Sequence, residues 1–141
     1  MNVEVNYVAV LLASVVSMAV GFLWYSPVMF AKPWMKLMGY TAESMKEAQK
    51  EMAKTYGISF VLSIVTAYVL HHVMILSENY FHYPMLMTGL SSAFWMWLGF
   101  VAPVQMTDML FGKKKRDLFV INTGYQLASL MAMGVTIGLM I

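Results

Sequence analysis

The sequence predicts an all-α membrane protein, an antiparallel bundle of four transmembrane helices that forms a single domain over residues 1–141. Three observations predict this class. Hydrophobic residues make up 60% of the chain and charged residues only 11%, whereas about a quarter of the residues in soluble domains are charged. Four apolar runs are each long enough to cross a hydrocarbon core about 30 Å thick. All nine Lys and Arg residues fall in two of the connections between these runs.

The spans are predicted from the positions of the apolar runs and their flanking residues. Trp24 and Tyr25 close the first run with rings that are typical of a membrane–water boundary, and Pro27 ends the helix. Pro103 lies inside the third run, where we expect it to distort the helix. The predicted spans are residues 5–25, 56–76, 85–110 and 118–140.

A charged segment separates the first two spans. Thr41 is a candidate N-cap for a helix over residues 41–54, in which rows of Glu and Lys flank a narrow apolar stripe. This pattern predicts an amphipathic helix that lies on the cytoplasmic surface of the membrane. A solvated linker helix held by ion pairs three residues apart explains the pattern equally well.

The basic residues predict the orientation of the chain. Five lie between Lys32 and Lys54, and four lie between Lys113 and Arg116. Because Lys and Arg in short loops stay cytoplasmic, both termini and the connection around Glu78 are predicted to be extracytoplasmic. The first span lacks a small-residue cleavage site, so we expect it to be retained. The second basic group suits anionic lipid headgroups at the cytoplasmic face and is too short to indicate nucleic acid.

Small residues recur at four-residue spacing on three of the spans. Such residues let two helix backbones approach closely. A homo-oligomer through the GxxxG pattern of the fourth span, or through the Ser59 face, is one arrangement that they would allow. The predicted helix-packing residues are Ala13, Ser17, Gly21, Ser59, Ser63, Gly134 and Gly138.

The ends of the first and third spans resemble each other. Gly21 and Pro27 precede Lys32 in the first, and Gly99 and Pro103 precede Lys113 in the third. This likeness predicts a 2+2 internal repeat, the arrangement of some transporters. Chance similarity between apolar helix ends that contain Gly and Pro is the alternative.

Polar side chains inside the predicted spans form one candidate site near the cytoplasmic side. Its members are Tyr25, Gln105, Asp108, Asn122 and Gln126. Asn122 and Gln126 are one helical turn apart and can point into the bundle together. Asp108 could pair with Lys113 or Arg116, or belong to an ion or proton site. Hydrogen bonds between helices that only fix the packing are the favoured interpretation of the group.

Histidines gather near the opposite end of the second span. His71 and His72 lie in the last turns of that span, and His82 lies in the connection after it, with several methionines nearby. Imidazole and thioether groups bind soft metals. Adjacent residues on a helix point about 100° apart, however, and no HxxxH spacing is present. We therefore predict no metal site. We also predict no cofactor, because the chain has no cofactor-binding motif and no cysteine.

Four short motifs carry a resemblance to a known family. They are Trp24-Tyr25-Ser26-Pro27, Phe30-Ala31-Lys32-Pro33-Trp34, Met109-Leu110-Phe111-Gly112-Lys113 and Asn122-Thr123-Gly124-Tyr125. With these motifs the chain resembles, over nearly its whole length, the bacterial membrane family catalogued as domain of unknown function 1761. The resemblance implies a small bacterial inner-membrane protein with four helices. It implies no reaction and no catalytic residues.

No catalytic signature is present in the sequence. It contains no GxSxG, Walker, Rossmann or zinc motif. We therefore expect a non-catalytic accessory or interaction protein of the inner membrane. The alternative is a small transporter or channel subunit that acts as an oligomer, because four helices alone seldom enclose a pore. An enzyme that acts on lipid is a more distant third.

Overall fold

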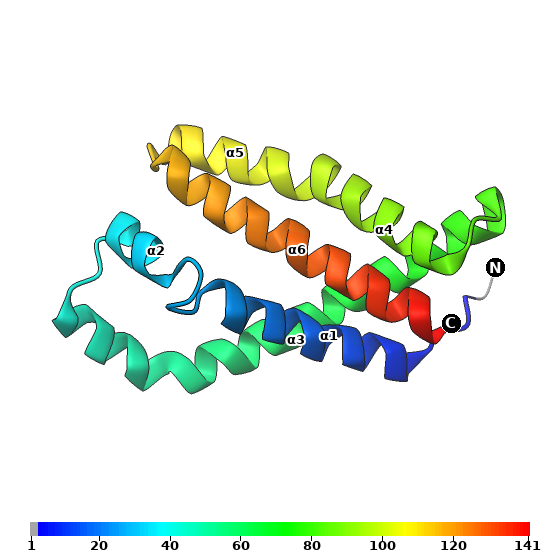
Figure 1. The fold of residues 1–141 in the computed structure, drawn as a ribbon, viewed down its shortest axis with the longest axis horizontal. Coiled ribbons are helices and arrows are strands. Elements are labelled where there is room, and N and C mark those ends of the chain that lie inside the picture. Colours follow the sequence, from blue (N-terminus) through cyan, green and yellow to red (C-terminus); the bar gives the residue numbers. More distant parts are fainter. Residues whose placement is uncertain (1–2) are drawn as a thin grey trace.

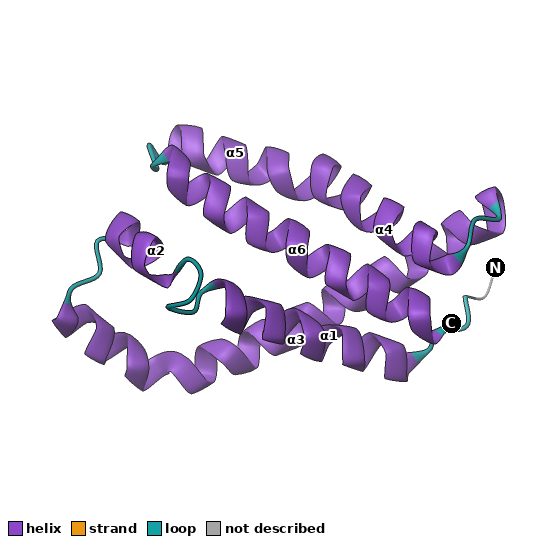
Figure 2. Cartoon of the chain, in the orientation of Figure 1, coloured by secondary structure: helices purple, strands orange, loops and turns teal. Residues whose placement is uncertain are grey.

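Helices account for nearly all of residues 3–141, the part of the chain that the computed structural model describes (Figure 2). Four of the helical stretches are long and apolar enough to cross a membrane, which confirms the four predicted candidate spans. One of the four is continuous from Met85 to Phe111 and comprises α4, η1 and α5. The elements are α1 (Tyr7–Trp24), α2 (Ala31–Met38), α3 (Ala42–Phe81), α4 (Met85–Met96), the π-helical η1 (Trp97–Val101), α5 (Ala102–Phe111) and α6 (Arg116–Met140).

The spans alternate in direction, so the start of α1, the α3–α4 connection and the end of α6 lie together at one end of the molecule (Figure 1). We call this the terminal end. The α5–α6 turn and α2 lie at the opposite end, which carries all the Lys and Arg residues and which we call the basic end. In the bundle, α6 packs against α1 and α4, while α3 packs against α1 and α4.

Large apolar side chains cover the outside of the bundle. On α3, for example, Val61, Leu62 and Val65 are each more than half exposed. A soluble monomer rarely leaves so much contiguous apolar surface in water. Together with the four candidate spans, this surface indicates a multi-pass membrane protein whose helices contact lipid.

The second span and the charged segment before it form one helix, α3. Thr41 is its N-cap, as predicted, and exchanges capping hydrogen bonds with Ser44. The prediction of a separate surface helix over residues 41–54 is wrong, because α3 continues without a break to Phe81. No proline interrupts the junction, and the one glycine there, Gly57, costs a helix only about 1 kcal/mol.

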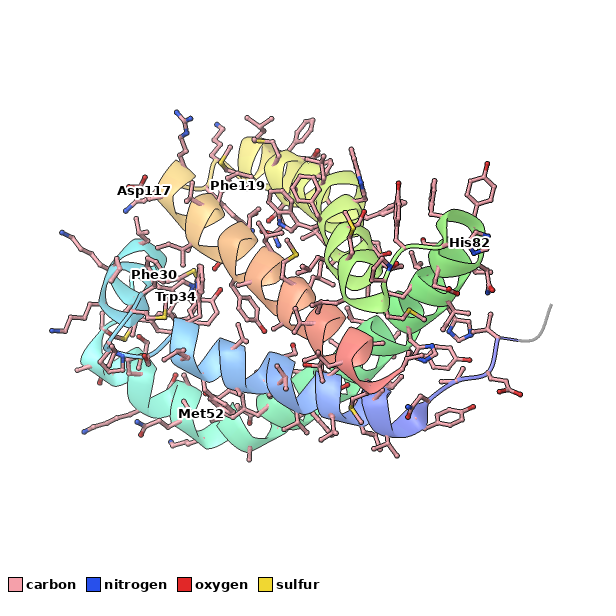
Figure 3. The ribbon with its side chains drawn as sticks, turned by 45° about the vertical axis from the view of Figure 1, so that its right-hand side comes forward. Phe30, Trp34, Met52, His82, Asp117 and Phe119 are labelled. Carbon is pink, nitrogen blue, oxygen red and sulfur yellow. The ribbon has the colours of Figure 1, made fainter. Side chains whose placement is uncertain are left out.

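Helix α2 was absent from the prediction. The chain leaves α1 in a turn that contains Pro27 and then forms the short helix Ala31–Met38. Gly39 ends this helix in the left-handed conformation, with φ of 72°, a common glycine role. Phe30 and Trp34 lie together at the basic end, far from His82 at the terminal end (Figure 3).

Pro103 distorts the third span without ending it. Helix α5 directly follows the π-helical turn Trp97–Val101, and the proline is its second residue. The N–H of Ala102, which caps this turn, bonds to the carbonyl of Trp97. A proline cannot donate to the carbonyl four residues earlier, and a wider turn relieves its clash with that carbonyl. Because the chain leaves the helix near Pro27 but continues through Pro103, the likeness between the two segments is one of sequence and not of local structure.

Small residues bring α4 and α6 into close contact. A Cβ on Gly134 would lie 2.5 Å from the carbonyl oxygen of Gly89, and a Cβ on Gly138 would lie 2.9 Å from that of Met85. The GxxxG pair therefore packs within the chain and is not available to a second copy. Around it lies an apolar core formed by Val10, Ala13, Ala67, Leu70, Met74, Ala93, Leu130, Met133 and Ile137.

The predicted packing face of α1 lies against α6. Ser17 is buried and shares a hydrogen bond of 2.7 Å with Ser129. Gly21 lies against the ring of Tyr125, whose hydroxyl oxygen would be 3.2 Å from an added Cβ. On α3, Ser63 is also buried inside the bundle, and Ser59 is half-buried.

Candidate functional site

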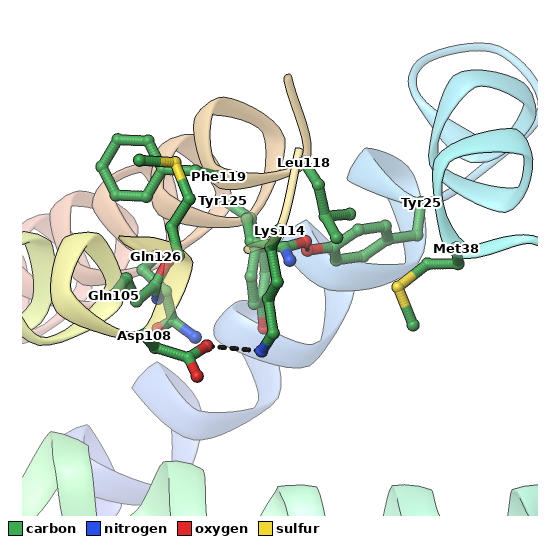
Figure 4. Close-up of a pocket in the computed structure, with 11 residues that line it drawn as sticks. Tyr25, Met38, Gln105, Asp108, Lys114, Leu118, Phe119, Tyr125 and Gln126 are labelled. Atoms are coloured by element: carbon green, nitrogen blue, oxygen red, sulfur yellow. Dashed lines mark hydrogen bonds and ion pairs between the residues drawn. The ribbon is translucent and has the colours of Figure 1, made fainter. Parts of the chain in front are cut away.

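A pocket of about 460 Å³ lies at the basic end of the bundle (Figure 4). Helix α5, the α5–α6 turn and the first half of α6 form most of its wall, and the ends of α1 and α2 complete it. All five residues of the predicted polar cluster line this one pocket. They are Tyr25, Gln105, Asp108, Asn122 and Gln126.

Asn122 is held in place by a hydrogen bond from the end of α1. The hydroxyl of Tyr25 donates to Oδ1 of Asn122 at 2.8 Å. The ring of Tyr25 also packs edge-on against Trp34 of α2, with ring centroids 5.4 Å apart, and against Tyr125 of α6. The amide oxygen of Asn122 is therefore used within the protein, which leaves its amide NH₂ group as the free donor.

Gln105 is anchored in a similar way from the other side. The hydroxyl of Thr123 donates to Oε1 of Gln105 at 2.6 Å, and Nε1 of Trp97 donates to the backbone carbonyl of Thr123 at 3.0 Å. The π-helical turn thus supplies the tryptophan that fastens the third span to α6. As at Asn122, the amide oxygen is occupied and the NH₂ group is the free donor.

Asp108 forms an ion pair with Lys114 across the mouth of the pocket. The prediction of Lys113 or Arg116 as its partner is wrong. Lys113 adopts a positive φ of 50°, which turns the chain back so that the N–H of Lys114 bonds to the carbonyl of Met109. The two charged side chains are 61% and 48% exposed, so solvent screens the pair.

Gln126 completes the polar wall without an anchor. It is half-buried and lines the pocket, yet it makes no hydrogen bond to any side chain or backbone group in residues 3–141. Its amide can therefore both donate to and accept from a ligand. With Asn122 and Gln105 it gives the pocket three amide NH₂ groups that have no acceptor in the described part of the chain.

Several contributors to the pocket were missed from the sequence. Leu118 and Phe119 of α6, Met109 of α5 and Met38 of α2 form its apolar side. The signals for α2 were present, since a proline in its first turn and a glycine just after its end are typical helix boundaries. Ser26, which follows Tyr25 in the Trp24–Pro27 motif, donates a hydrogen bond to the carbonyl of Leu23 and does not line the pocket.

The three histidines at the terminal end do not converge. His71 is fully buried, and its Nε2 accepts a 3.2 Å hydrogen bond from the backbone N–H of Asn6. His72 bonds to the carbonyl of Tyr68 in its own helix, and His82 is exposed at the end of α3. Within residues 3–141, no group of three or more His, Asp or Glu side chains is placed to hold a metal ion.

A second pocket, of about 530 Å³, lies between α3 and α4 toward the terminal end. Trp95, Phe81 and Phe100 give it aromatic walls, and Ser77 and Ser92 supply hydroxyl groups. It contains none of the predicted site residues. Charged side chains are absent from its lining, so it offers less chemistry for recognition than the pocket at the basic end.

Comparison with known proteins places the chain in a family. No curated protein and no solved structure matches the sequence. The family described as protein of unknown function (DUF1761) matches residues 8–138. This match covers all four candidate spans almost completely and includes every residue of the pocket at the basic end. The chain therefore belongs to the DUF1761 family.

Proposed function

We propose that the protein is a non-catalytic accessory or interaction protein of the bacterial inner membrane that binds a ligand in the pocket at its basic end. One observation carries this proposal: three amide NH₂ groups and an ion pair line the same cavity, and these NH₂ groups have no acceptor among residues 3–141. Polar groups that face a cavity without partners are typical of a binding site.

The orientation of the chain supports a cytoplasmic position for this pocket. Every Lys and Arg lies at the same end of the bundle as the pocket. Basic residues of short loops remain on the cytoplasmic side of a bacterial membrane. The pocket then opens at the level of the cytoplasmic headgroups, and both chain ends face the other side.

The chemistry of the lining favours binding over catalysis. The wall consists of amides, tyrosines, apolar side chains and one screened ion pair. Among residues 3–141, this lining holds no serine, threonine or histidine, and its lysine and aspartate are paired with each other. Such a set can hold a polar group in a defined orientation.

The arrangement also favours binding over transport by a single copy. The pocket at the basic end and the pocket between α3 and α4 are separate. Between the two ends, the fully buried Leu70, Met74 and Ile137 form part of the apolar core, and the Gly89–Gly134 contact closes the space between α4 and α6.

Native mass spectrometry of the protein, extracted directly from its membrane in polymer-bounded lipid particles, tests the proposal. We expect the wild type to retain one bound non-protein molecule. Gln126→Leu should lower the fraction that carries it at least threefold, because it removes a free amide from the wall. Gln49→Leu is the matched control, because Gln49 is an exposed glutamine of α3 outside the pocket. Equal retention by the two variants would contradict the proposal.

A further inference from the structure

The charges that line the pocket at the basic end are balanced. Among residues 3–141, Lys114 is the only cation and Asp108 the only anion in its lining. The neighbouring Lys113, Lys115 and Arg116 do not line it. A site built for an anionic group would keep a carboxylate off its wall, because like charges repel. A balanced pair suits a ligand group that itself carries one positive and one negative charge.

The negative part of such a ligand fits the amide side of the pocket. Within residues 3–141, the NH₂ groups of Gln105, Asn122 and Gln126 have no hydrogen-bond acceptor, and Lys114 lines the same pocket. A phosphate ester offers several acceptor oxygens and can use these donors together. Hydrogen bonds from an ammonium group to such oxygens are charge-assisted and are therefore stronger than neutral ones.

The positive part fits Asp108. This carboxylate is 61% exposed at the mouth of the pocket and contacts only Lys114 among charged groups. A ligand ammonium can pair with Asp108 while the ligand phosphate pairs with Lys114, so that the internal ion pair is exchanged for two external ones. A primary ammonium brings N–H donors to the carboxylate, whereas a quaternary ammonium has none.

The apolar side of the pocket continues toward lipid. Met109, Leu118 and Phe119 line the pocket itself. One helical turn from Met109 toward the middle of the bilayer, Met106 of α5 is 41% exposed. An acyl chain can follow this surface from the pocket into the bilayer, which favours a lipid over a soluble phosphate ester.

From these features we infer that the pocket selects an aminophospholipid, whose headgroup joins a phosphate ester to a primary ammonium, over the anionic lipids of the same leaflet. The inference rests on the proposed function and specifies the ligand of that site. It separates two roles at the basic end: Lys113, Lys115 and Arg116 attract anionic headgroups in general, while the pocket selects by its paired charges.

Lipid selection can be measured on the full chain. The protein is reconstituted in vesicles of equal parts dioleoyl phosphatidylethanolamine, phosphatidylglycerol and phosphatidylcholine, extracted in mild detergent and analysed by native mass spectrometry. We expect wild type to retain the ethanolamine lipid at least tenfold over each of the others. Asp108→Asn should bring the ratio of ethanolamine to choline lipid close to one. Circular dichroism confirms that the variant is folded.

Glu51→Gln is the matched control, because Glu51 forms an exposed ion pair with Lys54 outside the pocket. It should leave the lipid ratios of wild type unchanged. Three outcomes would each overturn the inference. They are preferential retention of phosphatidylglycerol, equal retention of phosphatidylcholine and phosphatidylethanolamine, and displacement of the bound lipid by millimolar glycerophosphoethanolamine. Retention of a lipid without the ethanolamine preference would leave the proposed function standing. If the protein retains no lipid, both the inference and the proposed function are contradicted.

Discussion

Asn6 donates its backbone N–H to Nε2 of His71, which lies 65 residues later in the chain, at a distance of 3.2 Å. The side chain of Asn6 caps α1 through Ala9 and donates to the carbonyl of Met140 at the end of α6. A single asparagine therefore ties α1, α3 and α6 together at the terminal end. The tie depends on the imidazole as an acceptor, because no other group in residues 3–141 accepts from this N–H.

We expect His71→Phe to lower the free energy of unfolding by about 1–3 kcal/mol, because it leaves the N–H of Asn6 without its acceptor in a part-buried site. His72→Phe is the control, since His72 bonds only within its own helix. Unfolding curves of both variants in the same detergent measure the difference. A loss in His72→Phe as large as that in His71→Phe would argue against the tie.

The contact between Gly89 and Gly134 predicts opposite effects of adding one methyl group at two glycines. Gly134→Ala would place a Cβ against the backbone of Gly89 and should destabilise the bundle by about 1–3 kcal/mol. Gly57→Ala meets no atom within 4 Å and lies in the middle of α3, so it should be neutral or stabilise by up to about 1 kcal/mol. Thermal unfolding monitored by circular dichroism distinguishes the two, and equal shifts would contradict the close packing of α4 and α6.

The continuity of α3 predicts the distance between two spin labels placed in its charged and apolar parts. Spin labels at Glu43 and Tyr56 span 13 residues of one helix, which corresponds to about 20 Å at 1.5 Å per residue. Double electron–electron resonance in lipid vesicles should give one narrow distribution at this value, once the length of the labels is included. A shorter or broad distribution would show a bend near residue 55 and support a separate surface helix.

The proposed orientation can be tested with single cysteines, because the chain contains none of its own. Lys50→Cys lies at the basic end and Asn79→Cys at the terminal end, and both positions are exposed. A membrane-impermeant maleimide should label Asn79→Cys in intact cells but reach Lys50→Cys only after the membrane is opened. Labelling of Lys50→Cys in intact cells would reverse the orientation.

Patterns within single helices predicted much of this molecule. Apolar run length located the four candidate spans, and Thr41 was recognised as a cap from its sequence neighbours alone. Asn122 and Gln126 line one pocket, because residues four apart share a face of a helix. These features depend on local geometry, which sequence spacing determines.

Features that depend on the path of the backbone between helices were not predictable in the same way. The partner of Asp108 is Lys114 because Lys113 takes a left-handed conformation, and the charge order alone does not reveal this. The bond from Asn6 to His71 joins two segments that lie far apart in the sequence. Helix α3 is continuous, although its first part is charged and its second part is apolar, and this sharp change in composition favours a break.

The length of α3 has a consequence for how the protein meets the aqueous phase. Its 40 residues correspond to about 60 Å, twice the thickness of the hydrocarbon core and more than a whole bilayer of about 40–45 Å with its headgroups. The excess length matches the charged first fourteen or so residues, about 20 Å of rod, which a helix α3 that crosses the bilayer upright would project into water. Antibody fragments raised against residues 42–55 would then bind an accessible epitope outside the lipid headgroups. Bound fragments would mark the orientation of each protein molecule in the membrane.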